Sequence, residues 1–344
     1  MDIFKNEEGY TFIIVIWTLV IIGIIFSSLY DEVTLNNLLV RNNVQEKRLY
    51  QEAVSGVSLA IHALKEDETL YDSSFDKWTE EISYEGENGI TSVVNIVPIG
   101  NKLNINYTDQ AILRQLNWWN ENIEKEIAEV LIPDLVFMKS ILGDNFEKSK
   151  EILTTYGRFN VNDDEITGMD KILRNAEIQD ALREQITESL KNHRENKKIE
   201  SLEVLMDEIE GLDDGIFEKI EKYLTTEGRI NINFVNEEVM KFIFKNEKIE
   251  SRSYENILSL REEEEITDLH DIDEFIPRDG KEKIIKYFSV SSNYFKVNVK
   301  SSSSEGNTVY NLEAIIERNY NKEDEEWNLQ VIKWKTDQQI AESD

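Results

Sequence analysis

The sequence predicts an α+β fold in which a long N-terminal helix packs on a small antiparallel sheet, with a large all-α insert dividing the sheet. Three observations support this prediction. An uncharged apolar run is followed by helical periodicity as far as residue 65, a repeated helical pattern fills residues 101–287, and β-branched alternating segments flank that region on both sides. The sheet is therefore expected to be built from residues 66–100 and 288–335.

The composition limits the classes of function. The chain has 344 residues with 38 basic and 69 acidic side chains, a net charge of -31, which opposes electrostatic attraction to nucleic acid or anionic lipid. It contains no cysteine, which excludes disulfides, thiolate metal sites and a cysteine nucleophile. Because 40% of the residues are hydrophobic, most of the chain is expected to fold around packed cores.

The first element is a helix that begins with the apolar run GYTFIIVIWTLVIIGIIFSSL. Residues 10–29 contain no Asp, Glu, Lys or Arg, and twenty helical residues span the roughly 30 Å of a bilayer core. Apolar residues then recur at helical spacing to Leu64, with no proline to end the helix. We therefore expect one helix over residues 10–65, with residues 10–29 crossing the membrane.

This rod, with an apolar end and an amphipathic end, resembles the N-terminal helix of type IV pilins and pseudopilins. In that superfamily a prepilin peptidase cuts after a glycine that precedes the apolar run, and Gly9 stands in that place. The resemblance implies that residues 1–9 are a leader, that Tyr10 becomes the mature N-terminus and is methylated, and that the apolar run is kept. An uncleaved single-pass anchor is the alternative.

Two positions narrow the resemblance. Most pilins carry Glu at the fifth mature position, where it neutralises the N-terminal amine of a neighbouring subunit in the apolar filament core; here the residue is Ile14. The absence of Glu, together with Trp17 three residues later, is similar to the type II secretion protein K family (general secretion pathway protein K) of minor pseudopilins. The acidic leader and the Tyr10 start depart from the usual pattern.

The middle of the chain contains a tandem repeat. LTTYGRFNVN at 153–162 matches LTTEGRININ at 224–233, and MKSILG at 138–143 matches MDEIEG at 206–211. We expect repeats at about 134–198 and 199–265, a half copy at 266–287, and a further fragment, NKLNIN, at 101–106. Each reads as a helical hairpin around a glycine turn, too small to bury its own apolar face, so neighbouring units should stack.

Hairpins of this kind occur in two classes of protein with different functions. They resemble the helix-hairpin-helix (SAM-like) modules of DNA-binding proteins, including membrane-anchored DNA receptors, but Asp144, Asp213 and Asp214 stand where phosphate would lie. The protein K family has a helical insert with N-x-N motifs, which match three segments here. The motif residues are Asn104, Asn106, Asn160, Asn162, Asn231 and Asn233.

The last elements are strands. YFSVSSNYFKVNVKS, NTVYNLEAIIERNY and WNLQVIKWK have strand-like patterns separated by turn segments, and ITSVVNIVPIG at 90–100 supplies another strand before the insert. In a pilin headpiece such a sheet packs on the distal part of the long helix. A separate three-stranded module is the alternative.

No catalytic motif is present in the sequence. His62, His193 and His270 are isolated, and neither a hydrolase signature nor a nucleotide-binding glycine loop occurs, so no enzyme activity is expected. Acidic runs at 163–170, 210–215 and 262–274 contain enough oxygens for calcium but lack EF-hand spacing. We expect these runs to be solvated and the protein to have no resident cofactor, with calcium as the alternative.

The resemblance to protein K implies a function. A minor pseudopilin of this family sits at the tip of the type II secretion pseudopilus, primes its assembly and takes part in the export of folded proteins. Implied partners are other minor pseudopilins, the peptidase, the inner-membrane assembly platform, secreted proteins and the lipid bilayer, but no nucleic acid. The implied location is the inner membrane, single-pass, with the C-terminal bulk in the periplasm. A minor pilin of a type IV pilus and a membrane-anchored DNA receptor are the alternatives.

Overall fold

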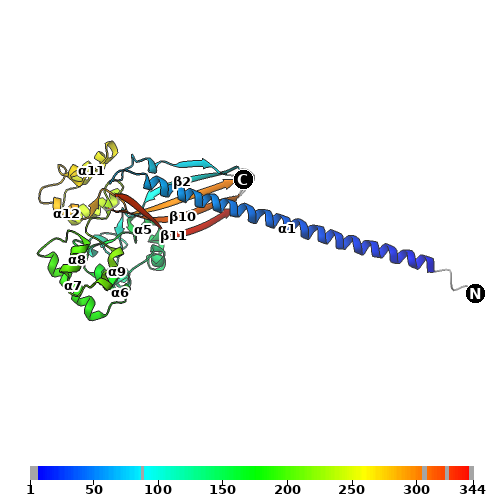
Figure 1. Cartoon of the computed structure of the whole chain (residues 1–344), viewed down its shortest axis with the longest axis horizontal. Coiled ribbons are helices and arrows are strands. Elements are labelled where there is room, and N and C mark those ends of the chain that lie inside the picture. Colours follow the sequence, from blue (N-terminus) through cyan, green and yellow to red (C-terminus); the bar gives the residue numbers. More distant parts are fainter. Residues whose placement is uncertain (1–6, 87–88, 304–307, 322–324, 341–344) are drawn as a thin grey trace, which may run out of the picture.

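A single long helix projects from a broad head in the computed structural model (Figure 1), which describes residues 7–86, 89–303, 308–321 and 325–340. This helix, α1, spans Glu7–Lys65. Residues 11–44 of α1 are exposed throughout, and burial begins only near Leu49. The first six residues of the expected leader lie outside the described residues.

The C-terminal part of α1 packs on a sheet through one face. Leu49, Ala53, Val57, Ala60 and Leu64 recur every three or four residues and are at most 1% exposed, which is the spacing that places side chains on one helical stripe. A Cβ at Gly56 would lie 2.7 Å from Val299 Cγ1. The helix and the sheet therefore approach too closely at this point for a side chain.

The sheet has five strands in the order β1-β2-β9-β10-β11, and every neighbouring pair is antiparallel. The strands are β1 (Ile82–Glu85), β2 (Ile90–Pro98), β9 (Tyr294–Ser303), β10 (Thr308–Asn321) and β11 (Glu326–Ile340). Strands β2 and β9 are neighbours although the insert separates them in sequence. The predicted α+β fold is confirmed, and β1 is an additional strand too short for its pattern to be recognised.

The insert consists of short helices joined by turns. They are α2 (Gln110–Leu113), α3 (Glu121–Ala128), η3 (Leu135–Met138), α4 (Lys139–Leu142), η4 (Gly143–Asn145), α5 (Phe146–Ile152), α6 (Thr167–Asn175), α7 (Asp180–Arg194), α8 (Leu202–Glu208), α9 (Asp214–Ile220), η5 (Glu221–Tyr223), α10 (Glu237–Asn246), α11 (Ser251–Glu263), η6 (Leu269–Ile272) and α12 (Lys281–Ile285). One further short helix, η1 (Lys77–Thr79), lies in the loop after α1.

Three short parallel strand pairs divide the insert into closed units. In each pair the strand carrying an N-x-N motif lies beside the strand that ends the same unit. The pairs are β3 (Leu103–Asn104) with β4 (Leu153–Thr154), β5 (Phe159–Asn160) with β6 (Leu224–Thr225), and β7 (Ile230–Asn231) with β8 (Phe288–Ser289). We call them unit 1 (103–154), unit 2 (159–225) and unit 3 (230–289).

The units share their cores unequally. Units 1 and 3 contribute to one continuous apolar core, in which Phe244 and Phe288 are at most 1% exposed. Unit 2 buries a separate core around Phe159, to which unit 1 adds Tyr107. The core around Phe159 combines residues of the repeat at about 134–198 with residues of the repeat at about 199–265, so the closed units cut across the sequence repeats.

Candidate functional site

The predicted processing site lies at the start of α1. Gly9 and Tyr10 are both helical, and Ile14 and Trp17 follow in the next turns with exposures of 59% and 64%. The Thr18 hydroxyl donates to the Ile14 carbonyl at 2.8 Å, so the one hydroxyl of this turn is satisfied within the helix. The N-terminal part of α1 projects away from the head (Figure 1).

The apolar run of α1 is long and apolar enough to cross a membrane by length and composition. Its large side chains are exposed, including Phe12 at 66%, Ile24 at 64% and Phe26 at 68%. Such a continuous apolar surface is not stable in water. A lipid bilayer or a protein partner would cover it.

The first asparagine of each N-x-N motif forms a local turn. Its side-chain oxygen accepts a hydrogen bond from the backbone N–H two residues later, at 2.9 Å in all three units. This is an Asx turn, which directs the chain out of the short strand. The three residues, Asn104, Asn160 and Asn231, are at most 2% exposed.

The second asparagine of each motif makes the hydrogen bonds that a neighbouring strand would otherwise make. Its amide group accepts from the N–H and donates to the C=O of one distant isoleucine, so that it pairs with a backbone segment as a neighbouring strand would. The isoleucine partners of Asn106, Asn162 and Asn233 are Ile132, Ile199 and Ile266. The six motif residues therefore hold the three units together through internal hydrogen bonds.

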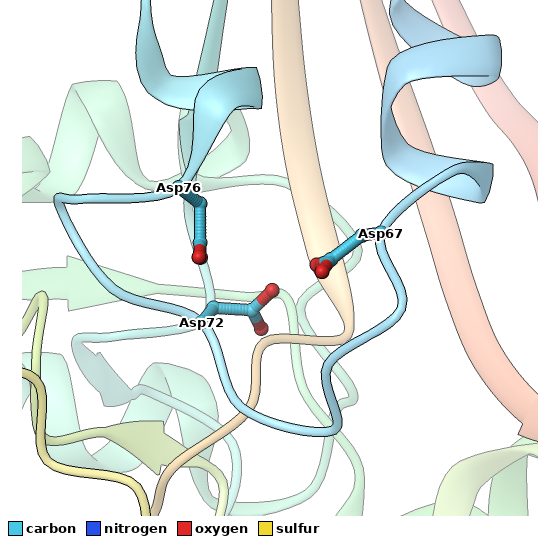
Figure 2. A group of neighbouring side chains, drawn as sticks. All are labelled: Asp67, Asp72 and Asp76. Atoms are coloured by element: carbon cyan, nitrogen blue, oxygen red, sulfur yellow. The ribbon is translucent and has the colours of Figure 1, made fainter.

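A group of acidic side chains joins α1, the sheet and the insert. Figure 2 shows Asp67, Asp72 and Asp76 pointing toward one another from the loop that follows α1, and we call them the aspartate junction. Their nearest carboxylate oxygens lie within 4.8 Å of one another. Such a group is costly unless positive charge or hydrogen bonds compensate it.

Arg318 of β10 supplies the compensating charge. Its side chain is 0% exposed, and its guanidinium contacts Asp72 directly and Asp67 at 3.1 Å. The same guanidinium lies 4.1 Å from the ring centroid of Trp327 and 4.7 Å from that of Phe295. Aromatic faces and two carboxylates together enclose the cation, which is how a buried arginine becomes stable.

The aspartate junction also holds unit 3 in place. The Asp72 carbonyl accepts from the side-chain amides of Asn231 at 3.1 Å and Asn233 at 2.9 Å. Glu265, just after α11, accepts from the hydroxyls of Tyr71 at 2.9 Å and Ser73 at 3.1 Å. One loop therefore connects the sheet to the insert, and nothing in the sequence marked this role because its partners lie far apart along the chain.

The aspartate junction does not match a calcium site. Calcium takes six to eight oxygen ligands, whereas here a guanidinium already contacts two of the three carboxylates. The predicted acidic runs also have other partners: Asp164 contacts Arg229, Asp213 caps α9, and Asp273 contacts Lys281. Their main use in this structure is to cap helices and pair with cations.

The ionisation of Asp76 should make the stability of the head depend on pH. Burial raises its pKa to about 6, and the nearby charges of Asp67, Asp72 and Glu265 act in the same direction, against the Ser73 N–H. The folded protein binds this proton more tightly than the unfolded chain, so protonation of Asp76 adds to the free energy of unfolding. This contribution is present at low pH and is lost as the pH rises through about 6.

Substituting Asp76→Asn should flatten this dependence, because the amide keeps an acceptor for the Ser73 N–H without a charge. Urea unfolding at pH 5 and pH 7.5 measures the difference. Asp144→Asn, at an exposed carboxylate, is the matched control and should leave the wild-type dependence intact. An equal pH dependence in Asp76→Asn and the wild type would contradict this assignment.

The hairpin turns present acidic side chains. At the turn between α8 and α9, Gly211 has a φ of +90° and the Asp213 side chain accepts from the Ile216 N–H. The carboxylate therefore occupies the helix N-terminus, where a phosphate would otherwise bind. The absence of DNA binding stays a prediction from the charge of the chain.

Comparisons with known proteins give a structural likeness. No family model matches the chain, and no curated protein matches it. Among solved structures, it is similar to a chain in the crystal structure of the GspK-GspI-GspJ complex from the enterotoxigenic Escherichia coli type 2 secretion system. The two chains are 14% identical, the match covers 87% of this chain and 99% of the other, and the TM-score is 0.38.

The arrangement of elements identifies the architecture directly. A helix of 59 residues projects from the head and packs its C-terminal part on an antiparallel five-stranded sheet. The helices of the insert lie between β2 and β9 in sequence, and these two strands are hydrogen-bonded neighbours in the sheet. The chain has a pilin-like α+β fold.

Proposed function

We propose that this protein is a minor pseudopilin of the protein K type, located at the tip of a type II secretion pseudopilus. The observation that carries the proposal is the position of the insert. It lies at the end of the sheet farthest from the apolar end of α1 (Figure 1). A subunit with its anchor at one end and a broad head at the other fits the apex of a filament.

Steric crowding explains why the apex suits this shape. In a helical filament the subunits share a core of parallel α1 helices, and each head lies beside the heads of its neighbours. An insert of about 185 residues on the distal side of the sheet would meet the subunit above. A tip subunit has no neighbour above it, so the insert is tolerated there.

The proposed partners follow from the same arrangement. Other minor pseudopilins would pack against the exposed part of α1, and the bilayer would hold its apolar run before assembly. The prepilin peptidase, the inner-membrane assembly platform and secreted proteins complete the set. The proposed location is the inner membrane, with the head in the periplasm, and the proposed role is priming of assembly and export rather than catalysis.

We propose no resident cofactor for this role. The positive charge of Arg318 within the aspartate junction and the use of acidic side chains as helix caps support this part of the proposal. Asp268 and Asp271, for example, form a capping box at η6.

Processing at Gly9 is the decisive experiment. Mass spectrometry of the protein extracted from membranes should find a chain that starts at Tyr10 and is methylated there. Gly9→Val should retain all nine leader residues, because the peptidase requires a small residue at that place. Gly23→Ala, at a position with nothing within 4 Å of the added Cβ, should be processed normally. Wild-type protein that keeps its leader in cells with an active peptidase would refute the proposal.

Ile14→Glu should move the protein from the tip into the filament shaft. A carboxylate at this position could neutralise the N-terminal amine of a neighbouring subunit, which isoleucine cannot do. Immunogold labelling of sheared filaments measures the ratio of shaft to tip positions. Ile21→Glu places the same charge elsewhere on the apolar run and serves as the control. Labelling confined to the tip in the Ile14→Glu variant would count against this explanation.

A further inference from the structure

One edge of the five-stranded sheet is open to a further strand. The outermost strand on this side is β11, which pairs with β10 alone. Among the described residues, no backbone hydrogen bond joins β11 to any other segment. The opposite edge is formed by β1, which has only 4 residues. Since alternate N–H and C=O groups of an edge strand have no neighbour to bind, β11 presents a long row of free hydrogen-bonding groups.

The first half of β11 lacks the usual protection of an edge strand. Natural edge strands are commonly short, contain proline, or carry charges and bulges that prevent further pairing. The segment WNLQVI, residues 327–332, is uncharged, has no proline and is rich in residues that favour strands. The protecting features come only at its end, where Ile332 is the extra residue of a bulge and Lys333 and Lys335 follow. We call residues 327–332 the open edge segment.

The core between α1 and the sheet is incompletely covered beside the open edge segment. Four residues pack against this core but are only partly buried: Val54 and Ile61 of α1, and Leu329 and Val331 of β11. Trp334 is 47% exposed and lies opposite the core residue Ala314, so its indole is on the side of the sheet that faces α1. An apolar side chain placed beside β11 on this side would cover apolar surface that is now exposed.

Exposed apolar side chains also occur near the other side of this edge. Lys333 lies opposite Ile315, whose two neighbours in β10 belong to the core under α1, so Lys333 is on the face turned away from α1. Its amine contacts the carboxylate of Asp134, which caps η3. Val136 and Phe137 of η3 are 60% and 67% exposed. An added strand directs alternate side chains to opposite faces, so it could bury apolar groups on both sides of β11.

We propose that β11 is the docking site for one extended strand of a partner protein, which adds to the sheet along the open edge segment. The partner backbone would complete the free hydrogen bonds of β11. Apolar residues at every second position would cover Trp334 and the open side of the core. Lys335, an exposed cation just beyond the segment, favours a carboxylate at that end of the partner strand. This inference does not depend on the proposed function.

A second copy of this chain does not fit the edge. β11 lies roughly along the direction of α1 (Figure 1). Antiparallel pairing of two β11 strands would therefore point the two apolar runs in opposite directions, and one membrane could not hold both. Parallel pairing in register would place Lys333 and Lys335 opposite their own copies, and like charges directly opposite each other are destabilising. The added strand therefore belongs to a different protein.

Hydrogen exchange of the full-length protein in detergent tests the proposal. The probe is a short synthetic peptide of alternating threonine and valine with a glutamate at one end. It should slow the exchange of the β11 amides that β10 does not bind by roughly tenfold or more, and leave β1 unchanged. The same peptide with N-methylated backbone amides cannot pair and is the control. No slowing in β11 at millimolar peptide, or equal slowing in β1 and β11, would overturn the proposal.

Substitutions at the edge supply the second test. Ile332→Glu and Trp334→Glu change exposed side chains, so the fold should be kept, but each removes apolar surface and adds a carboxylate that competes for Lys335. Peptide binding, measured by fluorescence anisotropy, should weaken roughly tenfold in both. Val97→Glu, at an exposed position of the inner strand β2, is the matched control and should bind as the wild type does. Unchanged binding in the two edge variants, or equal weakening in Val97→Glu, would overturn the proposal.

Exchange measured without peptide distinguishes the other possible occupant. The exchange rates of the β11 amides in the full-length wild type should not change with protein concentration, because a second copy does not fit the edge. Slower exchange in β11 at higher protein concentration, together with dimers in sedimentation, would identify a second copy as the occupant and overturn the proposal. This measurement does not depend on whether any variant folds.

Discussion

Replacing Arg318 by methionine is expected to lower the free energy of unfolding of the head by about 3–5 kcal/mol, the range measured when one partner of a buried ion pair is removed. The reason is the charge that remains. Asp72 is 0% exposed and Asp67 is 7% exposed, so neither carboxylate can be hydrated when the guanidinium is absent. The stacking of the cation on Trp327 is lost as well.

Urea unfolding followed by tryptophan fluorescence measures this loss, because Trp327 lies against Arg318. Arg252→Met, at an exposed site, controls for the removal of a positive charge from an acidic protein. Adding Asp72→Asn to Arg318→Met should recover part of the stability, since it removes the buried charge that the first substitution leaves unpaired. A loss below about 1 kcal/mol in Arg318→Met, the usual value for exposed pairs, would contradict the role assigned to Arg318.

Replacing Asn233 by leucine is expected to have the second largest effect, a loss of about 3 kcal/mol or more. The Asn233 amide donates to the carbonyls of Ile266 and Asp72 and accepts from the Ile266 N–H, in a position only 8% exposed. Leucine has nearly the same size but leaves the N–H and C=O of Ile266 unpaired, whereas the Asp72 carbonyl keeps its bond from Asn231. Each buried unpaired group costs about 1–3 kcal/mol.

The repeat supplies an internal comparison for this prediction. Asn162→Leu removes the equivalent bonds to Ile199 and a bond to Thr226, but its side chain is less buried and does not touch the aspartate junction. Its effect should be smaller and confined to unit 2. Hydrogen exchange of the individual units distinguishes the two variants, and exposed Asn122→Leu is the control. Equal losses in Asn162→Leu and Asn233→Leu would refute the special role of Asn233.

Local patterns predicted most of the elements correctly. The apolar period of α1, the alternation in β2 and the strand-like runs of β9, β10 and β11 are contained in consecutive residues, so they can be recognised without knowledge of distant partners. The tandem repeat was equally visible. The strand β1 was not predicted, because four residues contain too few alternations to be distinguished from a turn.

The candidate sites were predicted less completely. Gly9, Tyr10, Ile14 and Trp17 were selected through resemblance, and their processing and filament roles stay predictions. The motif asparagines were recognised as a pattern, but their pairing with isoleucines 26 to 37 residues away had no sequence signal. Arg318 was overlooked because an arginine in a strand is usually exposed, and only its burial distinguishes it.

The sequence by itself determined the elements whose causes are local: a helix with an apolar end, strands of period two and three copies of an N-x-N motif. Only the tertiary structure decided which contacts hold these elements together. It closed the units through parallel strand pairs, joined units 1 and 3 in one core and placed Arg318 between Asp67 and Asp72. Burial and charge pairing depend on side chains that meet only after the chain has folded, so no window of consecutive residues contains them.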